Sequence, residues 1–507
     1  MKVRYSRISS SRPEPKTDFV VIKPICKDKV KKVDVVPYNQ RISTAANDKN
    51  LSQALEQWSQ LQAAGCQPTA HTYCAMVNAF VRCGQLSRAE EFVQKMESSI
   101  PIDGQTRQGY IITLTALLKG YFMSSEFARS HTLFPKILHV TMGKLGSRTL
   151  DTYLRGCLRT GAFAEGLAAF QDLKIEKSEM SSIYASKMMA MRLAPKSASE
   201  CVSTDPSVSI QIASAYIRLG KFDRAQSWFV RARELLFASC APEREFDKLQ
   251  RSEMIRQCDF YTGSTLRVST MCATTLLTRV LFLKESDQLA GWRSLGLEKF
   301  APATQDLLVS VVDDFCGKIK SAKKVVVEVC SGAGEWICRE AQTECETLYI
   351  AVEVRFDRCV EILTRVAFLG LSNVFVLCGD CKSLPSLVPR HCVSELHVNY
   401  PEPPPINTSD IEEAMSFDII TKKFLSDASL ILVPHSGSLS IVTDDKLFAT
   451  SVSTLLSDIW KTPVFPKSSK TLVDSYFARF FSKKAKRYQV VAIPLSSGPL
   501  PCATPTA

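Results

Sequence analysis

The chain has 507 residues, and one hydrophobic core rarely organises more than about 250 to 300, so at least two domains are expected. Hydrophobic residues make up 45% and charged residues 22%, a composition that excludes a wholly disordered chain. The 63 Lys and Arg exceed the 51 Asp and Glu by 12, which favours a polyanionic partner such as RNA. No apolar run approaches the roughly 20 residues that cross a bilayer, so no membrane partner is expected.

Residues 1–34 form a basic leader. Its first twelve residues contain four cations, four serines and no acid: the cations are Lys2, Arg4, Arg7 and Arg12. This composition is typical of mitochondrial and plastid transit peptides, and a solvated basic tail fits it equally well. The 18 cysteines, without a secretory hydrophobic segment, fit a reduced compartment. We therefore expect an intracellular protein; mitochondrion and plastid fit the leader, and cytoplasm and nucleus stay open.

A helical repeat follows the leader. The pattern Gly-x-Leu-x-x-Ala begins at Gly84, its variants begin at Gly161 and Gly220, and weaker copies begin near residues 49 and 125. The anchors at 49 and 84 are 35 residues apart, and hydrophobic periodicity predicts helices over 72–81 and 87–96. A period near 35 built from helix pairs predicts an α-solenoid, which we assign to residues 35–240.

The repeat unit from His71 to Asp103 resembles the pentatricopeptide (PPR) repeat, and the resemblance extends with insertions over about residues 36–235. Arrays of this family read single-stranded RNA, one base per repeat. The resemblance therefore implies RNA-binding residues at Asn39 and Cys74, which occupy the base-reading position after the tyrosine of the first helix. A repeat surface that contacts protein, or tRNA by shape alone, is the alternative. We expect a connector over residues 241–310.

From Lys323 onward, β-branched runs alternate with helical patterns. The expected strands cover residues 323–330, 348–354, 373–380, 394–401 and 438–445, with a helix over 357–369. This alternation predicts a doubly wound α/β sheet in residues 311–495, followed by a tail at 496–507. Such a sheet binds its ligand at the carboxyl ends of the strands.

The expected strand ends carry the residues for a nucleoside ligand. The Gly332 and Gly334 loop lets backbone approach a ligand, and Glu353, 21 residues after Gly332, can accept hydrogen bonds from two ribose hydroxyls. Asp380 ends the third strand, where it can meet an adenine edge. The loop lacks the third glycine of a dinucleotide site, so the sequence favours S-adenosyl-L-methionine, which needs no pyrophosphate cradle.

Residues 322–493 resemble the TrmB-type tRNA (guanine-N(7)-)-methyltransferases. The family pattern E-I-G-x-G-x-G-E appears as Glu328–Glu335, and residues 369–381 follow its G-L-x-N-V-x-F-L-x-G-D-A. The resemblance implies a class I S-adenosylmethionine-dependent fold, Rossmann-like. It implies cofactor-binding roles for Glu328, Ser331, Gly332, Gly334, Glu353, Asp380 and Cys381. It also implies a catalytic role for Glu402 and substrate-binding roles for Asp444, Ser475 and Phe477.

The implied reaction is methyl transfer to guanine N7 of tRNA or another structured RNA. Because N7 already has a free lone pair, catalysis requires alignment with the sulfonium methyl group and a looped-out base. The chain departs from the family at Glu402, Pro404 and Ala478, which leaves two alternatives. One is a catalytically degenerate fold acting in RNA binding or ribosome assembly, and the other is methylation of exocyclic amines through Asn-Tyr-Pro-Glu at 399–402.

Two further expectations concern metal and partners. Cys378 and Cys381 have the spacing of zinc ligands, but Cys378 lies inside an expected strand, so we expect no metal. A protein partner is unknown.

Overall fold

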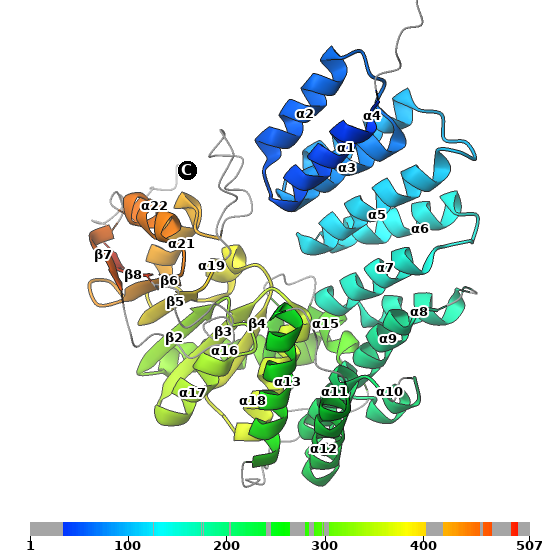
Figure 1. Ribbon diagram of the computed structural model, residues 1–507. Coiled ribbons are helices and arrows are strands. Elements are labelled where there is room, and N and C mark those ends of the chain that lie inside the picture. The colour runs from blue at the N-terminus through cyan, green and yellow to red at the C-terminus, as the bar shows by residue number, and fades with distance from the viewer. Residues whose placement is uncertain are drawn as a thin grey trace, which may run out of the picture.

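The computed structural model describes residues 34–124, 126–173, 175, 177–201, 204–239, 245–263, 279–282, 288–296, 298, 304–401, 419–456, 460–468 and 488–494. These residues form a curved array of paired helices that leads into a sheet covered by helices (Figure 1). Within the described part of the chain, no helix combines the length and apolar character needed to span a membrane.

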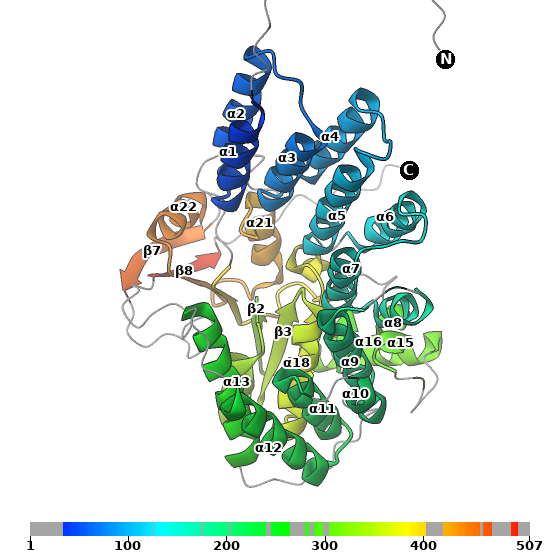
Figure 2. The ribbon, with the colours of Figure 1, turned by 45° about the vertical axis from the view of Figure 1, so that its right-hand side comes forward.

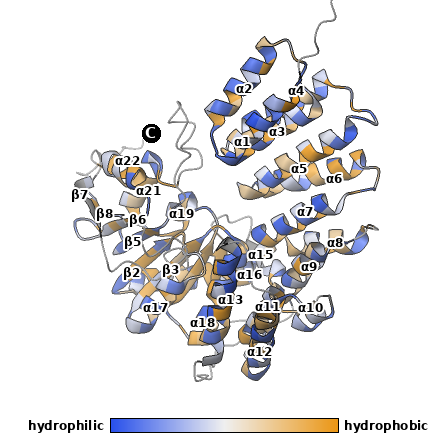
Figure 3. Ribbon diagram, in the orientation of Figure 1, coloured by the Kyte–Doolittle hydropathy of each residue, from blue (hydrophilic) through white to orange (hydrophobic). Residues whose placement is uncertain are grey.

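The array consists of successive helix pairs. They are α1 (Val36–Asn47) and α2 (Leu51–Ala63), α3 (Ala70–Arg82) and α4 (Leu86–Ser99), α5 (Arg107–Met123) and α6 (Phe127–Val140), α7 (Ser147–Thr160) and α8 (Phe163–Asp172), α9 (Glu179–Met191) and α10 (Pro195–Cys201), and α11 (Pro206–Arg218) and α12 (Phe222–Ala238). The first helices of successive pairs pack side by side from α1 to α11. Each helix mixes hydrophobic and hydrophilic segments, as an element with one covered face requires (Figure 3).

Local sequence signals explain the helix ends. Thr69 and Thr72 form a reciprocal capping box at the start of α3. Gly161 and Gly220, which follow α7 and the end of α11, have φ of 83° and 67°, a left-handed conformation that glycine adopts without strain. The helices predicted over 72–81 and 87–96 are α3 and α4, so the prediction of a helical-pair array is confirmed here.

The sheet has eight described strands. They are β1 (Val280–Phe282), β2 (Lys324–Val329), β3 (Thr347–Glu353), β4 (Val374–Cys378), β5 (Glu395–Asn399), β6 (Ser438–Thr443), β7 (Trp460–Ser468) and β8 (Tyr488–Pro494). Their order is β1-β4-β3-β2-β5-β6-β8-β7; β8 pairs antiparallel with both β6 and β7, and the other pairs are parallel. The direction of winding reverses between β2 and β5, which is where an open α/β sheet has its ligand crevice. The predicted doubly wound fold is confirmed.

Within the described residues, eight further helices accompany the sheet. They are α13 (Glu245–Gly263), α15 (Gln288–Ser294), α16 (Gln305–Ser321), α17 (Glu335–Thr343), α18 (Phe356–Leu369), α19 (Leu384–Leu387), α21 (Lys422–Ile431) and α22 (Lys446–Leu456). The connector expected over 241–310 is more than a linker, because it supplies the edge strand β1, which pairs in parallel with β4. The indole of Trp292 donates a hydrogen bond to the carbonyl of Val280 at 3.2 Å, which fixes this strand. The sheet therefore begins before residue 311.

The helical array and the sheet share one hydrophobic core. Helix α18, which joins β3 to β4, packs against both α7 and α11. The ring of Phe163 meets that of Phe356 edge-on at 5.2 Å, and the buried Arg218 donates a hydrogen bond to the Thr364 hydroxyl at 2.7 Å. The first helix pairs, α1 to α4, lie on the same side of the molecule as α21 and α22 (Figures 1 and 2).

Candidate cofactor and substrate site

Five parallel strands, β2 to β6, end at the same edge of the sheet. Glu328, Glu353 and Asn399 lie at the ends of β2, β3 and β5 and are all buried. Asp380 lies two residues after the end of β4, and Asp444 directly follows β6. Buried carboxyl and amide groups normally require partners, so their concentration at one edge marks this edge as the candidate site.

The loop after β2 has an unusual backbone. Cys330, Gly332 and Gly334 all have positive φ, of 61°, 57° and 72°. A Cβ atom at Gly334 would lie 2.9 Å from Ile362 of α18, so glycine is required there for space as well as for conformation. The loop therefore passes close to α18, and the Gly334 amide donates a hydrogen bond within the loop to the Ser331 carbonyl at 2.8 Å.

Ser331 fastens this loop to β3. Its hydroxyl donates a hydrogen bond to the carbonyl of Glu328 at 2.8 Å and accepts one from the amide of Val352 at 3.1 Å. The Ser331 amide also donates to the Val352 carbonyl at 3.2 Å. The side chain expected to contact the cofactor thus holds the loop in shape.

Glu353 faces the same loop. Its Oε2 accepts a hydrogen bond from the Gly332 amide at 2.9 Å, and its Oε1 accepts one from the Arg355 amide at 3.0 Å. Burial raises the pKa of Glu353, although Arg358, 3.8 Å from Oε2, opposes this effect. A carboxylate has about four acceptor positions, so two remain for the hydroxyls of a ribose. The structure thus brings together Gly332 and Glu353 as the sequence predicted.

Glu328 is a buried carboxyl group with only one of its two oxygens hydrogen-bonded among the described residues. Its Oε1 accepts a hydrogen bond from Asn399 Nδ2 at 2.7 Å, whereas its buried Oε2 has no hydrogen-bond partner among the described residues. Burial raises the pKa of Glu328 to about 8. The Oδ1 atom of Asn399 is also buried without a partner in the described part of the chain. These two buried oxygens belong to side chains that are hydrogen-bonded to each other, and both lack a donor among the described residues. They fit a ligand that donates hydrogen bonds, such as an ammonium group.

Asn399 was not predicted as a site residue. It ends strand β5 and is 3% exposed. His397 lies opposite Glu328 in the pairing of β2 with β5, and Asn399, two residues further on, reaches the Glu328 carboxylate with its side chain. The available signal was its place as a polar residue at the end of an otherwise apolar strand. Only the strand order shows that this end adjoins β2.

The turn after β4 contains the next two predicted residues. Asp380 is exposed, and its Oδ1 accepts a hydrogen bond from the Lys382 amide at 3.0 Å, which caps the short 3-10 helix Cys381–Ser383. Cys381 is buried, and burial raises the pKa of its thiol. An exposed carboxylate at this edge can meet the polar edge of a base, while the thiol is a packing group.

The substrate side is only partly described. Asp444 is half-buried just after β6, and its neighbour Asp445 caps α22 by accepting the Phe448 amide at 3.0 Å. Asp444 therefore is not consumed by the helix cap. The predicted residues Glu402, Ser475 and Phe477 lie outside the described residues. Within the described part of the chain, no cluster of three or more His, Cys, Asp or Glu side chains could hold a metal ion.

The two predicted RNA-reading residues lie on the first helices of two successive pairs of the array, α1 and α3, which pack against each other. Asn39 is half-buried on α1, and Cys74 is half-buried on α3. The Cys74 thiol is hydrogen-bonded to Thr113 of α5, and burial raises its pKa. Cys74 is thus turned towards the neighbouring repeat more than towards a ligand.

A basic cluster on the first helices of the pairs was not predicted. It consists of Arg82, Lys119, Arg148 and Arg155, from α3, α5 and α7. Burial and the three arginines lower the pKa of Lys119, which shows that like charges are gathered there. Such an arrangement suits a polyanion.

Comparisons with known proteins agree with these observations. Residues 322–474 match the family model described as "Putative methyltransferase", and residues 64–97 match the PPR repeat. The tRNA (guanine-N(7)-)-methyltransferase of Chlamydia pneumoniae is 28% identical over 167 residues, which cover 32% of this chain and 72% of that protein. That of Chlamydia caviae is 27% identical over 164 residues, covering 31% and 70%.

Among solved structures, the 16S rRNA (adenine(1408)-N(1))-methyltransferase from Catenulisporales acidiphilia covers 37% of this chain and 94% of its own, at 16% identity and a TM-score of 0.29. The family match supports S-adenosylmethionine, the predicted cofactor. Residues 322–474 are therefore a methyltransferase-family domain, and the helical array that precedes it contains a PPR repeat.

Proposed function

We propose that this chain is an S-adenosylmethionine-dependent tRNA (guanine-N(7)-)-methyltransferase whose helical repeats aid RNA capture. The observation that carries the proposal is the pair of buried acids at adjacent strand ends. Glu353 is held by the Gly332 amide at 2.9 Å, and Glu328 is held by Asn399 at 2.7 Å. The relatives named tRNA (guanine-N(7)-)-methyltransferase match this same part of the chain.

Glu353 and Glu328 would bind different parts of a nucleoside cofactor. Glu353 has acceptor capacity for the two ribose hydroxyls, and its hydrogen bond from Gly332 fixes its direction. The unpartnered Oε2 of Glu328 suits a cationic group, whose charge would return the Glu328 pKa towards its ordinary range. When bound, S-adenosylmethionine supplies an activated methyl group.

The rest of the site serves alignment. Guanine N7 needs no base to remove a proton, so a carboxylate near the target acts by holding the ring in line and by excluding water. Asp444, half-buried at the carboxyl end of β6, is placed at the edge where a looped-out guanine would enter. For Glu402 the resemblance to the family supports a positioning role. The departures at Glu402, Pro404 and Ala478 make activity the decisive measurement.

The test is transfer of a labelled methyl group from S-adenosylmethionine to unfractionated tRNA. The wild type is compared with Glu353→Ala, Glu402→Ala and the control Glu346→Ala, whose carboxylate is 80% exposed in an ion pair with Lys323 away from the site. We expect label at guanine N7 with wild type and control. We expect loss of cofactor affinity with Glu353→Ala, and a lower turnover with retained cofactor affinity with Glu402→Ala.

The second candidate is a degenerate methyltransferase domain that only binds RNA. The replacement of the family's Trp and late Glu by Pro404 and Ala478 favours it. It predicts that wild type binds tRNA and cofactor and yet transfers no label to any RNA. That outcome would overturn the enzymatic proposal.

A further inference from the structure

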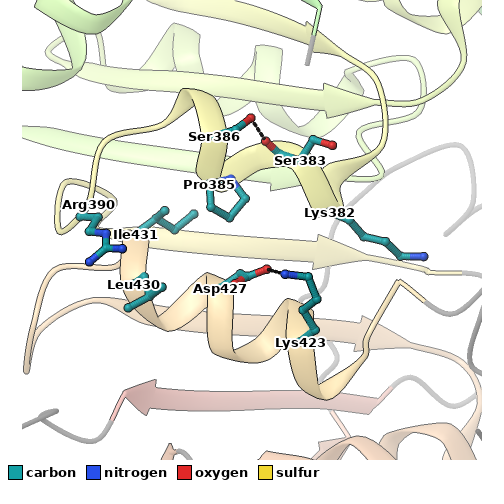
Figure 4. Close-up of a pocket in the computed structure, with 9 residues that line it drawn as sticks. All are labelled: Lys382, Ser383, Pro385, Ser386, Arg390, Lys423, Asp427, Leu430 and Ile431. Atoms are coloured by element: carbon teal, nitrogen blue, oxygen red, sulfur yellow. Dashed lines mark hydrogen bonds and ion pairs between the residues drawn. The ribbon is translucent and has the colours of Figure 1, made fainter. Parts of the chain in front are cut away.

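A polar groove lies beside the candidate site. It has a volume of about 380 Å³ and runs between α19 and α21. Figure 4 shows Lys382 and Lys423 at one end of the groove and Arg390 at the other. The remaining side chains that line it are Ser383, Pro385, Ser386, Asp427, Leu430 and Ile431.

The groove has an excess of positive charge. Three of its nine lining residues are cations and one, Asp427, is an anion. Asp427 forms an ion pair with Lys423 at 3.3 Å, but the Lys423 side chain is 83% exposed, so solvent screens this pair and the ammonium group remains accessible. Ser383 and Ser386 add hydroxyl groups, which can also bind an anion. The lining therefore suits an anionic, hydrogen-bonding ligand rather than an apolar one.

The groove opens at the functional edge of the sheet. Lys382 comes two residues after Asp380 at the carboxyl end of β4. Lys423 is the second residue of α21, the helix that joins β5 to β6 and therefore begins at this same edge. Both cations thus lie next to the positions where cofactor and target base are expected.

The distribution of charge along the chain is uneven here. Residues 402–418, which precede α21 in the sequence, contain five acids and no Lys or Arg. The groove cations come instead from the β4–α19 turn and from α21. The first helix pairs of the array lie on the same side of the molecule as α21, so an RNA bound to both would run along this side (Figures 1 and 2).

We propose that the groove between α19 and α21 binds the phosphate backbone of the substrate RNA, with Lys382 and Lys423 as its principal contacts and Arg390 at its far end. This inference rests on the proposed function for the identity of the RNA. Phosphate contacts position a nucleic acid without reading its sequence. The groove would therefore set where the RNA lies relative to the strand ends, while selection of the nucleotide occurs elsewhere.

The experiment measures binding of labelled unfractionated tRNA as a function of KCl concentration. The test variant is Lys382→Gln/Lys423→Gln. The control is Lys320→Gln/Lys323→Gln, which removes the same net charge from the end of α16 and the residue before β2, at the opposite edge of the sheet. Each lost phosphate contact lowers the slope of log Kd against log salt by about 1. We expect the groove variant to lose about two units of slope and to bind at least about tenfold more weakly at about 0.1 M salt.

The control variant is expected to keep nearly the wild-type slope. A groove variant whose slope and Kd equal those of the control would overturn the proposal. Poly-L-glutamate serves as a second probe: loss of binding to this peptide with unchanged binding to tRNA would assign the groove to an acidic protein and likewise overturn it. Melting temperatures of all variants verify that they are folded.

The readout is binding, so the result is independent of methyl transfer. If wild type binds tRNA but transfers no methyl group, the proposed enzymatic function fails while the salt slopes still decide the role of the groove. If transfer occurs and the slopes of groove and control variants coincide, the groove proposal fails alone.

Discussion

Glu328 links the chemistry of the site to the stability of the fold. Its pKa is raised to about 8 by burial, from an ordinary value of 4.5. Between these two values the unfolded chain releases the proton and the folded chain retains it. The unfolded state then binds fewer protons, so the free energy of unfolding falls as pH rises through this window.

The first prediction follows from that sign. Glu328→Gln keeps an oxygen that can accept the hydrogen bond from Asn399 and removes the titration. We expect the variant to gain stability over wild type progressively from about pH 5 to pH 8, by an amount on the order of a few kcal/mol. Urea unfolding of both proteins at several pH values measures this difference. Parallel stability profiles would contradict it.

At the residue scale, the sequence was informative about acids and uninformative about their partners. Glu353 could be placed because its spacing from Gly332 follows from one helix and one strand. Asn399 could not, because its contact with Glu328 depends on β5 lying beside β2, which is a property of the winding and not of any local pattern. Cys74 occupies the expected repeat position, but a contact with the next repeat turns its thiol inward.

At the scale of elements, helix α18 connects the two halves of the protein. Nine of its 14 residues are buried, because the sheet covers one face and the array covers another. The C-cap of α7, Gly161, lies against the ring of Phe356, three residues after Glu353. A displacement of this helix start would reach the backbone that holds the cofactor carboxylate.

A second prediction compares two glycines in the same local role. Gly161→Ala would place a Cβ atom 2.7 Å from the Phe356 ring, whereas Gly220→Ala meets nothing within 4 Å. Both substitutions carry the cost of a left-handed alanine, about 1 kcal/mol, and only the first adds overpacking of about 1 to 3 kcal/mol. We expect Gly161→Ala to be the more destabilising and to weaken cofactor binding. Denaturant unfolding and cofactor titration measure the two effects.

Equal effects of the two substitutions would show that the contact between Gly161 and Phe356 is not tight. Unchanged cofactor binding in a destabilised Gly161→Ala protein would show that the start of α18 is not coupled to Glu353.

A third prediction concerns the hydrogen bond between α11 and α18. Arg218 is 1% exposed, burial lowers its pKa to about 10, and it donates to the Thr364 hydroxyl at 2.7 Å and to the Ala190 carbonyl at 3.2 Å. Hydrogen bonds to charged groups contribute about 1.5 to 3 kcal/mol. We expect a double-mutant cycle of Arg218→Met and Thr364→Val to give a coupling free energy in this range. Additive effects would exclude a direct contribution of this bond.

The helices and strands were largely predictable from the sequence, but the contacts between elements that lie far apart in the sequence were not. Runs such as residues 325–329 are β-branched and buried, which identifies a central parallel strand. Strand β1 has only three residues, too few for a periodic signal, and it is defined by its pairing with β4. The sequence predicted a helix over 357–369, the position of α18, but nothing in its pattern indicates a partner helix more than 100 residues away.

At the scale of the whole molecule, the array is part of the structural support of the sheet. Aromatic contacts join them: the ring of Phe163 of α8 meets Phe356 of α18 at 5.2 Å, and the ring of Phe229 of α12 stacks at 4.8 Å on Tyr261 of α13, which in turn lies 4.9 Å from Phe368. Removing the array would therefore expose apolar surface on α18. A boundary at residue 311 therefore divides the repeat-containing part of the sequence from the methyltransferase-family part, but we expect the two parts to fold together.

The fourth prediction tests this dependence. A chain limited to residues 311–495 lacks β1, α13 and the array helices that cover α18, so we expect it to be aggregated or to lack a cooperative unfolding transition. The full chain is expected to unfold cooperatively under the same conditions. Near-ultraviolet circular dichroism and thermal unfolding compare the two. A stable, cooperatively folding fragment would contradict the prediction.

The attachment of the array through its later helices has a practical consequence. Helices α7 and α11 pack against α18, which lies on the sheet, whereas the main contacts of α1 to α4 are with neighbouring helices of the array. We therefore expect that the repeats formed by α1 to α4 can be exchanged without unfolding the methyltransferase-family domain. If these repeats bind RNA as proposed, such grafts would change which RNA the domain reaches, and the number of added repeats would set the distance.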